Sequence, residues 1–275
     1  MKKLWLLLSI SFVGLLTITQ VLAQKKLQLK INRYLEVRST SGDVTYQNKQ
    51  ISQLARIGAK LQNVGDSIST GQRSSSMLSL DTGIGFVQVA ENTKLEIQKL
   101  QTTSQGGRIT NLQVTGGQVR LKIRAFTHQD STLQIQTPAG ITGVRGTDFG
   151  VSVQPSGKTG VATLTGSVAT TAQGQRVYVN KGFQTIVIPG EPPSVPTRLR
   201  NDTRLDVQVL EERRNQQVRI VGKVDPVNLV MLNQPLITDR NGKFDIIIPM
   251  PANRRVAVTV TTPLSKKQDY VLVVP

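Results

Sequence analysis

The segment Gln118-Val119-Arg120-Leu121-Lys122-Ile123 alternates polar and apolar residues without interruption. Because successive side chains of a β-strand point to opposite faces of its sheet, this alternation predicts a strand with one buried and one exposed face. The same pattern predicts strands at residues 44–46, 77–80, 86–89, 94–97, 132–135 and 176–179. No stretch shows four helical turns with an amphipathic stripe. The sequence therefore predicts an all-β protein.

Glycine-containing turn signals separate these segments. They recur about every 8 to 12 residues, which is the spacing of meanders in sandwiches or flattened solenoids. They lie at Gly42-Asp43, Gly65-Asp66, Gly71, Asp81-Thr82-Gly83, Gly106-Gly107, Gly116-Gly117, Gly157, Gly166 and Gly174. For this part of the chain we predict a multi-strand sandwich or a flattened, solenoid-like domain.

The residues that carry most enzyme chemistry are scarce. The 275 residues contain no Cys and a single His, His128. This composition excludes disulfides, a thiolate nucleophile, Cys-based metal sites and a His-dominated metal site within one chain. His128 lies in a polar stretch and is interpreted as a loop residue, and Asp225, Asp239 and Asn241 lack the acidic spacing of a calcium loop. We expect a non-enzymatic protein with no catalytic residue, cofactor or metal.

The N-terminus has the pattern of a secretory signal peptide. Lys2 and Lys3 precede an apolar stretch, and Val21-Leu22-Ala23 places small residues before a cleavage site at Gln24. The alternative is an uncleaved anchor, because residues 4–23 are long enough to span a bilayer of roughly 30 Å. Both interpretations export the rest of the chain to the periplasm, the outer surface or the medium, and no later stretch predicts a membrane span.

The net charge of +17 falls to +15 when Lys2 and Lys3 are removed. Outside the inner membrane the available anions are lipid headgroups, acidic glycans and wall polymers, so we expect an anionic envelope polymer or an envelope protein as partner. Nucleic acid is not expected, since no aromatic residues are interleaved with the basic ones for base stacking. The candidate anion-contact residues are Arg198, Arg200 and Arg204. The alternative is that these charges keep a β-rich surface soluble and block pairing at sheet edges.

Proline divides the mature chain. Pro189, Pro192, Pro193 and Pro196 are four of the chain's 12 prolines, and the segment around them has no apolar period. Proline favours an extended backbone, so residues 189–197 are predicted to be a semi-rigid linker. The predicted organisation is a signal peptide over residues 1–23, a first domain over 24–188, the linker, and a second domain over 198–275.

An ordered series of motifs resembles the FecR domain over residues 37–187. It opens with Gly58-Ala59-Lys60-Leu61-Gln62-Asn63-Val64-Gly65-Asp66-Ser67-Ile68-Ser69-Thr70-Gly71, and residues 74–83 add a serine-rich strand that ends at Gly83. The block Thr137-Pro138-Ala139-Gly140-Ile141-Thr142-Gly143-Val144-Arg145-Gly146-Thr147-Asp148-Phe149 is similar to the family's central motif. Residues 164–168 and 181–185 are similar to its closing turns. The resemblance identifies residues 24–188 as a FecR-type β domain of a bacterial envelope protein.

The residues that carry this resemblance are interpreted as structural. They are Gly65, Asp66, Gly71, Thr137, Pro138, Val144, Arg145, Gly146, Thr147 and Phe149. Asp66 follows a glycine and is expected to order a turn. Arg145 is expected to bind turn carbonyls or to pair with Asp148 or Asp66, and anion binding is the alternative role.

The C-terminal region predicts about six strands, at residues 205–209, 218–224, 229–232, 244–248, 256–260 and 269–274. The series Gly222-Lys223-Val224-Asp225-Pro226 to Asp239-Arg240-Asn241-Gly242-Lys243-Phe244 resembles bacterial immunoglobulin-like modules, so we expect a small Ig-like sandwich. Asp239 is expected to cap a turn, Gly242 to supply a positive φ, and Phe244 to return to the core.

Three classes of function follow. The best-known FecR proteins are inner-membrane anti-sigma regulators with a cytoplasmic sigma-binding segment, which we do not expect in a chain whose apolar stretch starts at Leu4. The favoured expectation is a non-enzymatic, exported cell-envelope binding or scaffolding protein. The first alternative is a periplasmic receiver in an iron-uptake or cell-surface signalling system. The second alternative is an accessory subunit or enzyme acting on glycans.

Overall fold

The computed structural model describes residues 32–48 and 51–275, which are all-β. The predicted signal peptide and the Gln24 cleavage site lie outside the described residues. Asn32–Pro275 cluster as one compact unit. Seventeen strands, β1 to β17, form one hydrogen-bonded network, and six more form two three-stranded sheets. The all-β prediction is confirmed.

The seventeen strands form two layers, which we call sheet A and sheet B. Sheet A contains, in spatial order, β4 (Lys60–Leu61), β1 (Leu35–Ser41), β6 (Ser75–Leu80), β7 (Gly85–Val89), the second half of β9 (Arg108–Ile123), β12 (Asp148–Val153), β13 (Thr159–Thr165), β16 (Phe183–Val187) and β17 (Thr197–Arg198). Sheet B contains β3 (Ser52–Leu54), β2 (Val44–Gln47), β5 (Ser67–Thr70), β8 (Lys94–Thr102), the first half of β9, β10 (Thr132–Thr137), β11 (Gly140–Val144), β14 (Ser167–Ala172) and β15 (Gln175–Asn180).

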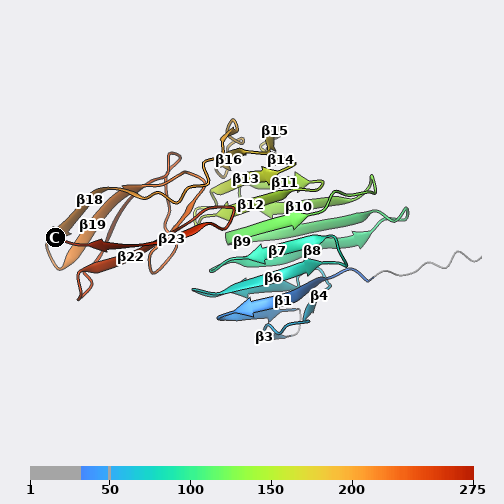
Figure 1. The fold of residues 1–275 in the computed structure, drawn as a ribbon, viewed down its shortest axis with the longest axis horizontal. Coiled ribbons are helices and arrows are strands. Elements are labelled where there is room, and N and C mark those ends of the chain that lie inside the picture. The colour runs from blue at the N-terminus through green and yellow to red at the C-terminus, as the bar shows by residue number, and fades with distance from the viewer. Residues whose placement is uncertain (1–31, 49–50) are drawn as a thin grey trace, which may run out of the picture. The chain divides into compact units, whose positions relative to one another are not determined.

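Successive hairpins alternate between the two sheets. β6–β7 lie in sheet A, β10–β11 in sheet B, β12–β13 in sheet A and β14–β15 in sheet B. Figure 1 shows the strands stacked one above another, from β1 in blue through β9 in green to β14 in yellow. The alternating residues Leu78, Val87, Leu121, Ile135 and Val168 meet in one core between the layers. The domain is therefore a sandwich whose chain path winds like a flattened solenoid.

Strand β9 joins the two layers. Residues 108–116 pair with β8 in sheet B, and residues 117–123 pair with β7 and β12 in sheet A. The predicted turn at Gly116-Gly117 is wrong, because both residues lie inside this strand. Gly117 has φ +87°, and a Cβ atom there would lie 2.1 Å from Thr93 Oγ1. Glycine is therefore required where the strand crosses between sheets, and in this sequence it marks a crossing instead of a chain reversal.

The Pro-rich segment lies against sheet A. The Ser194 amide donates to the Ile186 carbonyl at 2.9 Å, and Thr185 Oγ1 contacts the Ser194 carbonyl at 2.7 Å. β17 follows and pairs with β16. The predicted domain boundaries remain predictions.

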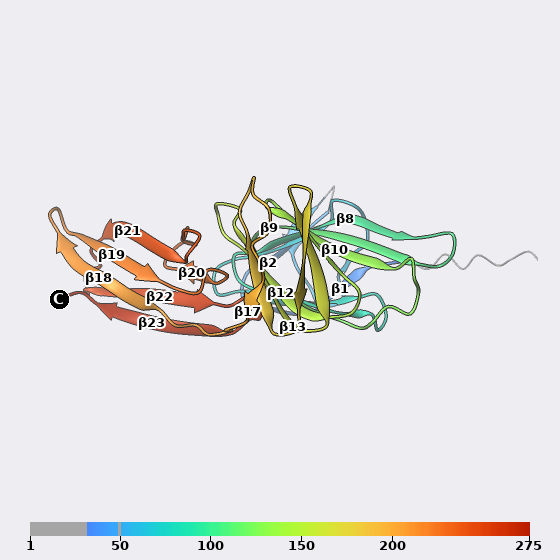
Figure 2. The ribbon, with the colours of Figure 1, turned by 90° about the horizontal axis from the view of Figure 1, so that it is seen from above.

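The C-terminal module, residues 199–275, contains two antiparallel sheets. One contains β18 (Asp206–Arg213), β19 (Gln217–Lys223) and β21 (Lys243–Pro249), and the other contains β20 (Leu229–Met231), β22 (Arg255–Thr261) and β23 (Lys267–Val273). Figure 2 shows β18, β19 and β21 side by side, with β22 and β23 as a second layer. Their apolar faces, which include Ile220, Phe244 and Val258, form a separate core. All six predicted strands are present, and the Ig-like assignment remains a prediction.

Candidate functional site

Three loops of the C-terminal module cover part of the outer face of sheet A, around β9, the β12–β13 hairpin and β16. The loops are residues 224–228, 238–239 and 262–265. Gln118 Nε2 on β9 donates to the Pro263 carbonyl at 2.6 Å, and Ser152 Oγ on β12 donates to the Val227 carbonyl at 2.5 Å. We call this contact between sheet A and the module the seam. Its donors approach backbone carbonyls of the loops, which fixes the loops in position.

More buried polar side chains extend the seam to the β12–β13 turn and to β16. Gln154 Nε2 donates to the Asn228 carbonyl and to Thr238 Oγ1, and Gln184 Nε2 donates to Asp225 Oδ1 at 2.8 Å. These side chains are at most 6% exposed. Since a buried polar group is costly without a partner, such a network stabilises one docked arrangement of the module.

Small residues allow the backbones to approach each other. A Cβ atom on Gly150 of β12 would lie 1.8 Å from the Pro263 carbonyl oxygen, and one on Gly160 of β13 would lie 2.6 Å from the Val227 carbonyl oxygen. Gly150 faces Ala162 across the β12–β13 ladder. The Gly150–Ala162 pair is therefore a floor on which a loop of the module rests.

Lys158, in the turn between β12 and β13, is buried in the seam. Its Nζ donates to Thr238 Oγ1 at 2.7 Å and to the Asp239 carbonyl at 2.6 Å. Burial lowers the pKa of the Lys158 ammonium to about 8, and the carboxylates of Asp239 and Asp225 offset only part of this effect.

We expect the free energy of unfolding to rise with pH between about 8 and 10.5 because of Lys158. In this window the unfolded chain holds a proton that the folded chain has released, so raising the pH favours the folded state. Below this window the Lys158 amine is protonated in both states, so it adds no pH dependence to the free energy of unfolding. The gain is at most about 3 kcal/mol, at 1.36 kcal/mol per pKa unit. Urea unfolding of the wild type and of Lys158→Met across this range measures it. Identical pH profiles would contradict the assignment.

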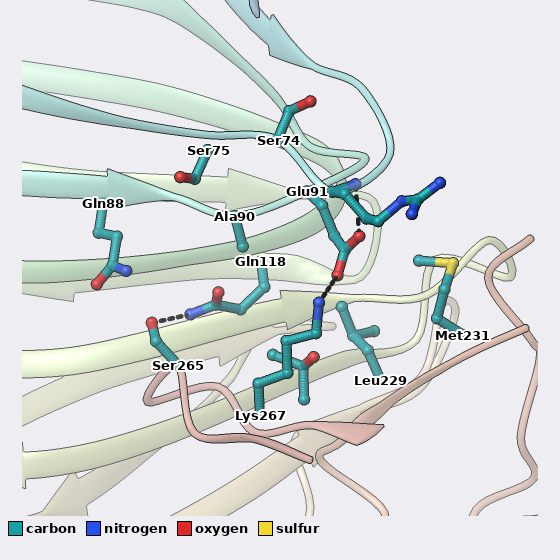
Figure 3. Close-up of a pocket in the computed structure, with 12 residues that line it drawn as sticks. Ser74, Ser75, Gln88, Ala90, Glu91, Gln118, Leu229, Met231, Ser265 and Lys267 are labelled. Carbon is teal, nitrogen blue, oxygen red and sulfur yellow. Dashed lines mark hydrogen bonds and ion pairs between the residues drawn. The ribbon is translucent and has the colours of Figure 1, made fainter. Parts of the chain in front are cut away.

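A hollow of about 260 Å³ opens at the seam, lined by residues of both sides (Figure 3). Glu91 accepts from Lys267 Nζ at 2.8 Å across it, and the Arg73 amide donates to the same carboxylate. Gln118 Nε2 also donates to Ser265 Oγ at 2.9 Å, while Gln118 Oε1 is buried without a partner. The ion pair adds an electrostatic contact to the seam at its solvent edge.

The FecR motif residues lie at turns and in the core of the domain. Asp66 Oδ2 accepts from the amides of Gln62 and Asn63 at 2.8 and 3.0 Å. Thr137 Oγ1 contacts Gly140 and Thr159 around the β10–β11 turn. Gly65 and Gly146 have positive φ angles, of +90° and +117°, and Gly146 packs on Ala125. The Gly71 amide donates to the Asp43 carbonyl, and the Thr147 carbonyl accepts from the Ile123 amide. Pro138 lies beside Gly157, and Val144 and Phe149 are in the core.

Of the two structural roles expected for Arg145, binding of a carbonyl is observed, and pairing with Asp148 or Asp66 is not. Arg145 is exposed, and its Nη2 donates to the Gln129 carbonyl. Asp148 instead forms a bidentate pair with Arg120, with both N–O distances at 2.9 Å. The strand register explains why Asp148 pairs with Arg120. Asp148 lies on β12 opposite Lys122 of β9, two residues from Arg120, whereas Arg145 precedes β12.

We expect Arg145→Ala to lower the free energy of unfolding by less than about 1 kcal/mol. The exposed guanidinium leaves no buried partner behind when it is removed, so the loss is that of a surface interaction. Thermal or urea unfolding of the variant measures the change. A loss of more than about 3 kcal/mol would mean that Arg145 has a buried partner.

The predicted anion-contact residues are brought together only in part. Arg198 and Arg200 line a hollow of about 420 Å³ with Ser194 and Thr197, and Arg204 lies outside that lining. Arg200 Nε lies 3.8 Å from Asp225 Oδ2. Two of the three arginines therefore line one hollow, and the Asp225 carboxylate lies beside Arg200 in the same lining.

The remaining predicted residues have local partners. His128 Nε2 lies 2.9 Å from the Gln105 carbonyl, and Asp239 Oδ1 accepts from the amides of Asn241 and Lys243. Gly242 has φ +82° and Phe244 is buried, as the turn prediction requires. Within residues 32–48 and 51–275, no three His, Cys, Asp or Glu side chains are placed to hold a metal ion. In the same residues, no helix has the length and apolarity needed to cross a membrane.

Sequence patterns did not indicate the seam. Strand β12 is buried on both faces, yet Phe149, Val151 and Val153 alternate with Asp148, Gly150 and Ser152 as they would in a strand with one face in solvent. The available signal was the small residues Gly150, Ser152, Gly160 and Ala162 at outward-facing positions, which are typical of a close backbone approach.

Comparison with protein families gives one match within this domain. Residues 66–169 match the family model for FecR, described as "FecR protein". This chain therefore carries a FecR domain, as the sequence motifs indicated. No curated protein matches the chain.

Two crystal structures of a candidate anti-sigma factor from Parabacteroides distasonis, at 2.50 and 1.65 Å resolution, are similar to part of it. The identity is 16%, the TM-score is 0.41, and the match covers 48% of this chain and 59% of that one. A polysaccharide lyase matches with 10% identity and a TM-score of 0.20, over 88% of this chain and 40% of the lyase.

Proposed function

We propose that this protein is a periplasmic receiver in a cell-surface signalling system, and that it acts by binding a protein partner and not by catalysis. The observation that supports this most directly is the FecR domain at residues 66–169, because FecR-family proteins are cell-envelope signalling proteins. Export of the chain is part of the proposal and depends on the predicted signal peptide.

The seam gives such a receiver a rigid frame. It holds the C-terminal module against sheet A through buried hydrogen bonds from Gln118, Ser152 and Gln154. The outer face of sheet B makes no hydrogen bond to the module among the described residues. A partner therefore has access to the outer face of sheet B, while the module covers part of the outer face of sheet A.

Transcription in a deletion strain tests this function. We expect loss of the protein to change a small set of transcripts, and the full-length chain to restore them. A chain that lacks residues 2–23 should fail to restore them, because it is not exported. Mass spectrometry of the exported protein should find Gln24 at its N-terminus. An unchanged transcriptome in the deletion strain, under envelope stress and under iron limitation, would contradict the proposal.

A second candidate function is binding of an anionic envelope polymer. The specific observation in its favour is the hollow that Arg198 and Arg200 share with the hydroxyl side chains of Thr185, Ser194 and Thr197. Arginine guanidinium groups bind carboxylates and phosphates well, so wall polymers and acidic glycans fit this hollow.

We expect retention on an acidic-glycan resin to fall steeply between low salt and about 1 M salt, where the Debye length shrinks to about 3 Å. The variant Arg198→Ser/Arg200→Ser/Arg204→Ser should elute earlier than the wild type. Arg213→Ser/Arg214→Ser/Arg255→Ser, with the same charge change elsewhere, should elute later than this triple variant. Equal elution of the two variants would show that the polymer binds by overall charge and not at this hollow.

A further inference from the structure

The outer face of sheet B has a hollow of about 420 Å³ over β10, β11, β14 and β15. We call this hollow the sheet B groove; its main lining residues are Ile141, Gly143, Arg145, Ala169, Arg176 and Tyr178. These strands form the end of sheet B at which β15 is the last strand, in the yellow part of the ribbon (Figure 1). Ile141 is 41% exposed and Tyr178 is 62% exposed, so apolar surface is left open to solvent there.

The strand register explains the shape of the groove. Gly143 on β11 lies opposite Ala169 on β14, and Ala169 lies opposite Tyr178 on β15. The middle of this row has almost no side chain, and a Cβ atom on Gly143 would meet no atom closer than 4.0 Å. The Gly143–Ala169 pair is therefore an open floor.

A similar glycine–alanine pair on sheet A already has a loop packed on it. There the Gly150–Ala162 pair also places a glycine opposite an alanine on adjacent strands, and the loop containing Pro263 rests on it. This chain thus shows what such a floor accepts, namely the backbone of a protein loop. The Gly143–Ala169 pair offers a second floor of this kind.

The charge of the groove indicates the chemistry of the occupant. Arg145 and Arg176 are both exposed, and none of the described residues that line the groove is acidic. Arg145 contacts only a carbonyl and Arg176 Nε only the Thr171 hydroxyl, so neither charge is neutralised by a carboxylate. A second copy of a chain with net charge +17 would be repelled. The complementary occupant is acidic.

We propose that the sheet B groove docks a loop of a partner protein that carries acidic side chains. This inference rests on the proposed receiver function and names the face that receives the partner. The loop backbone lies on Gly143 and Ala169, its acidic side chains pair with Arg145 and Arg176, and Tyr178 supplies apolar contact area at one end.

A cyclic peptide tests the groove directly. The probe presents Asp-Thr-Pro-Leu-Ser-Asp, which is the seam loop around Pro263 with an acidic residue at each end. Amide chemical shifts of the labelled full chain are followed during titration. We expect shifts at Gly143, Ala169 and Tyr178, and an affinity at least about tenfold weaker for a peptide with Asn in place of Asp.

Two variants distinguish the contribution of the open space over Gly143 from that of the two arginine charges. Gly143→Val fills the floor without changing charge, and Arg145→Glu/Arg176→Glu reverses the charge. Each should weaken peptide binding by about tenfold or more. The matched control Arg214→Glu/Arg255→Glu carries the same charge change at exposed positions outside the groove and should bind as the wild type does.

Three outcomes would overturn the proposal: no shifts at the groove, equal loss in the control variant, or self-association of the chain through this face. Stronger binding of polygalacturonate than of the peptide, lost in Gly143→Val, would assign the groove to a polymer and also overturn it.

In the deletion strain, Gly143→Val should fail to restore the transcripts. If it restores them fully, the groove proposal fails while the receiver function stands; if deletion changes no transcript, the receiver function fails and the peptide titration still decides the groove.

Discussion

Gly150→Val is expected to release the C-terminal module from sheet A and to lower the free energy of unfolding by about 3 kcal/mol. The added Cβ atom would lie 1.8 Å from a backbone carbonyl oxygen of Pro263, and a backbone atom cannot swing aside as a long side chain can. Valine suits a β-strand better than glycine, so the loss reports on the seam and not on β12 itself. Urea unfolding should change from one transition to two, because the FecR domain and the module would then unfold separately.

Gly143→Val is the matched control for this experiment. It makes the same replacement on the opposite sheet, where a Cβ atom meets nothing closer than 4.0 Å. Its unfolding should remain a single transition, with stability within about 0.5 kcal/mol of the wild type. If both variants unfold alike, the module is not seated on Gly150.

Arg33→Met is expected to lower the free energy of unfolding by about 3 to 5 kcal/mol. Arg33 donates to Asp81 Oδ2 at 3.0 and 2.9 Å, to two backbone carbonyls and to Thr110 Oγ1, and both charged side chains are nearly fully buried. Burial lowers the pKa of the Arg33 guanidinium, and Asp81 offsets part of that effect. Removing the arginine leaves the Asp81 carboxylate with only the Tyr34 amide and Arg108 at 3.5 Å.

A double variant separates the loss of the ion pair from the loss of packing. Arg33→Met/Asp81→Asn removes the unpaired charge, and asparagine keeps an acceptor for the Tyr34 amide and tolerates the φ of +46° at this position. We expect it to recover at least half of the stability lost in Arg33→Met, as measured by urea unfolding. If the double variant is less stable than the single one, Asp81 is not the group left unpaired.

Sequence patterns predicted some of the strands that face solvent on one side. β8, β10 and β19 were predicted from polar residues that alternate with buried apolar ones, whereas β14, with the same one-sided burial, was missed. All six strands of the C-terminal module were predicted, including β20, which is buried throughout. β12 and β13 were missed as strands although β12 alternates, because glycines within them, Gly150 and Gly160, resemble turn residues. A pattern based on burial of one face cannot report a face that is buried by another part of the chain.

The candidate site was less predictable than the fold. Gln118 and Ser265 meet although they are separated by 147 residues, and no local pattern connects them. Arg198 and Arg200 were predicted as anion contacts because arginines cluster there in the chain, and the structure places both on one hollow, where anion binding stays a prediction. Lys158 carried no signal in the sequence. Its role depends on a partner loop, at Thr238 and Asp239, that lies 80 and 81 residues away.

Zero-length carbodiimide crosslinking of the unmodified protein tests the central claim, that the C-terminal module is seated on sheet A of the FecR domain. The reagent joins a carboxylate to an amine only where the two are in contact, and Glu91 lies 2.8 Å from Lys267 across the seam. Mass spectrometry of the digested monomer should find an isopeptide bond between Glu91 and Lys267, and Gly150→Val should lose it. A monomer in which Lys267 crosslinks only to carboxylates of its own module, such as Asp269, would contradict the account.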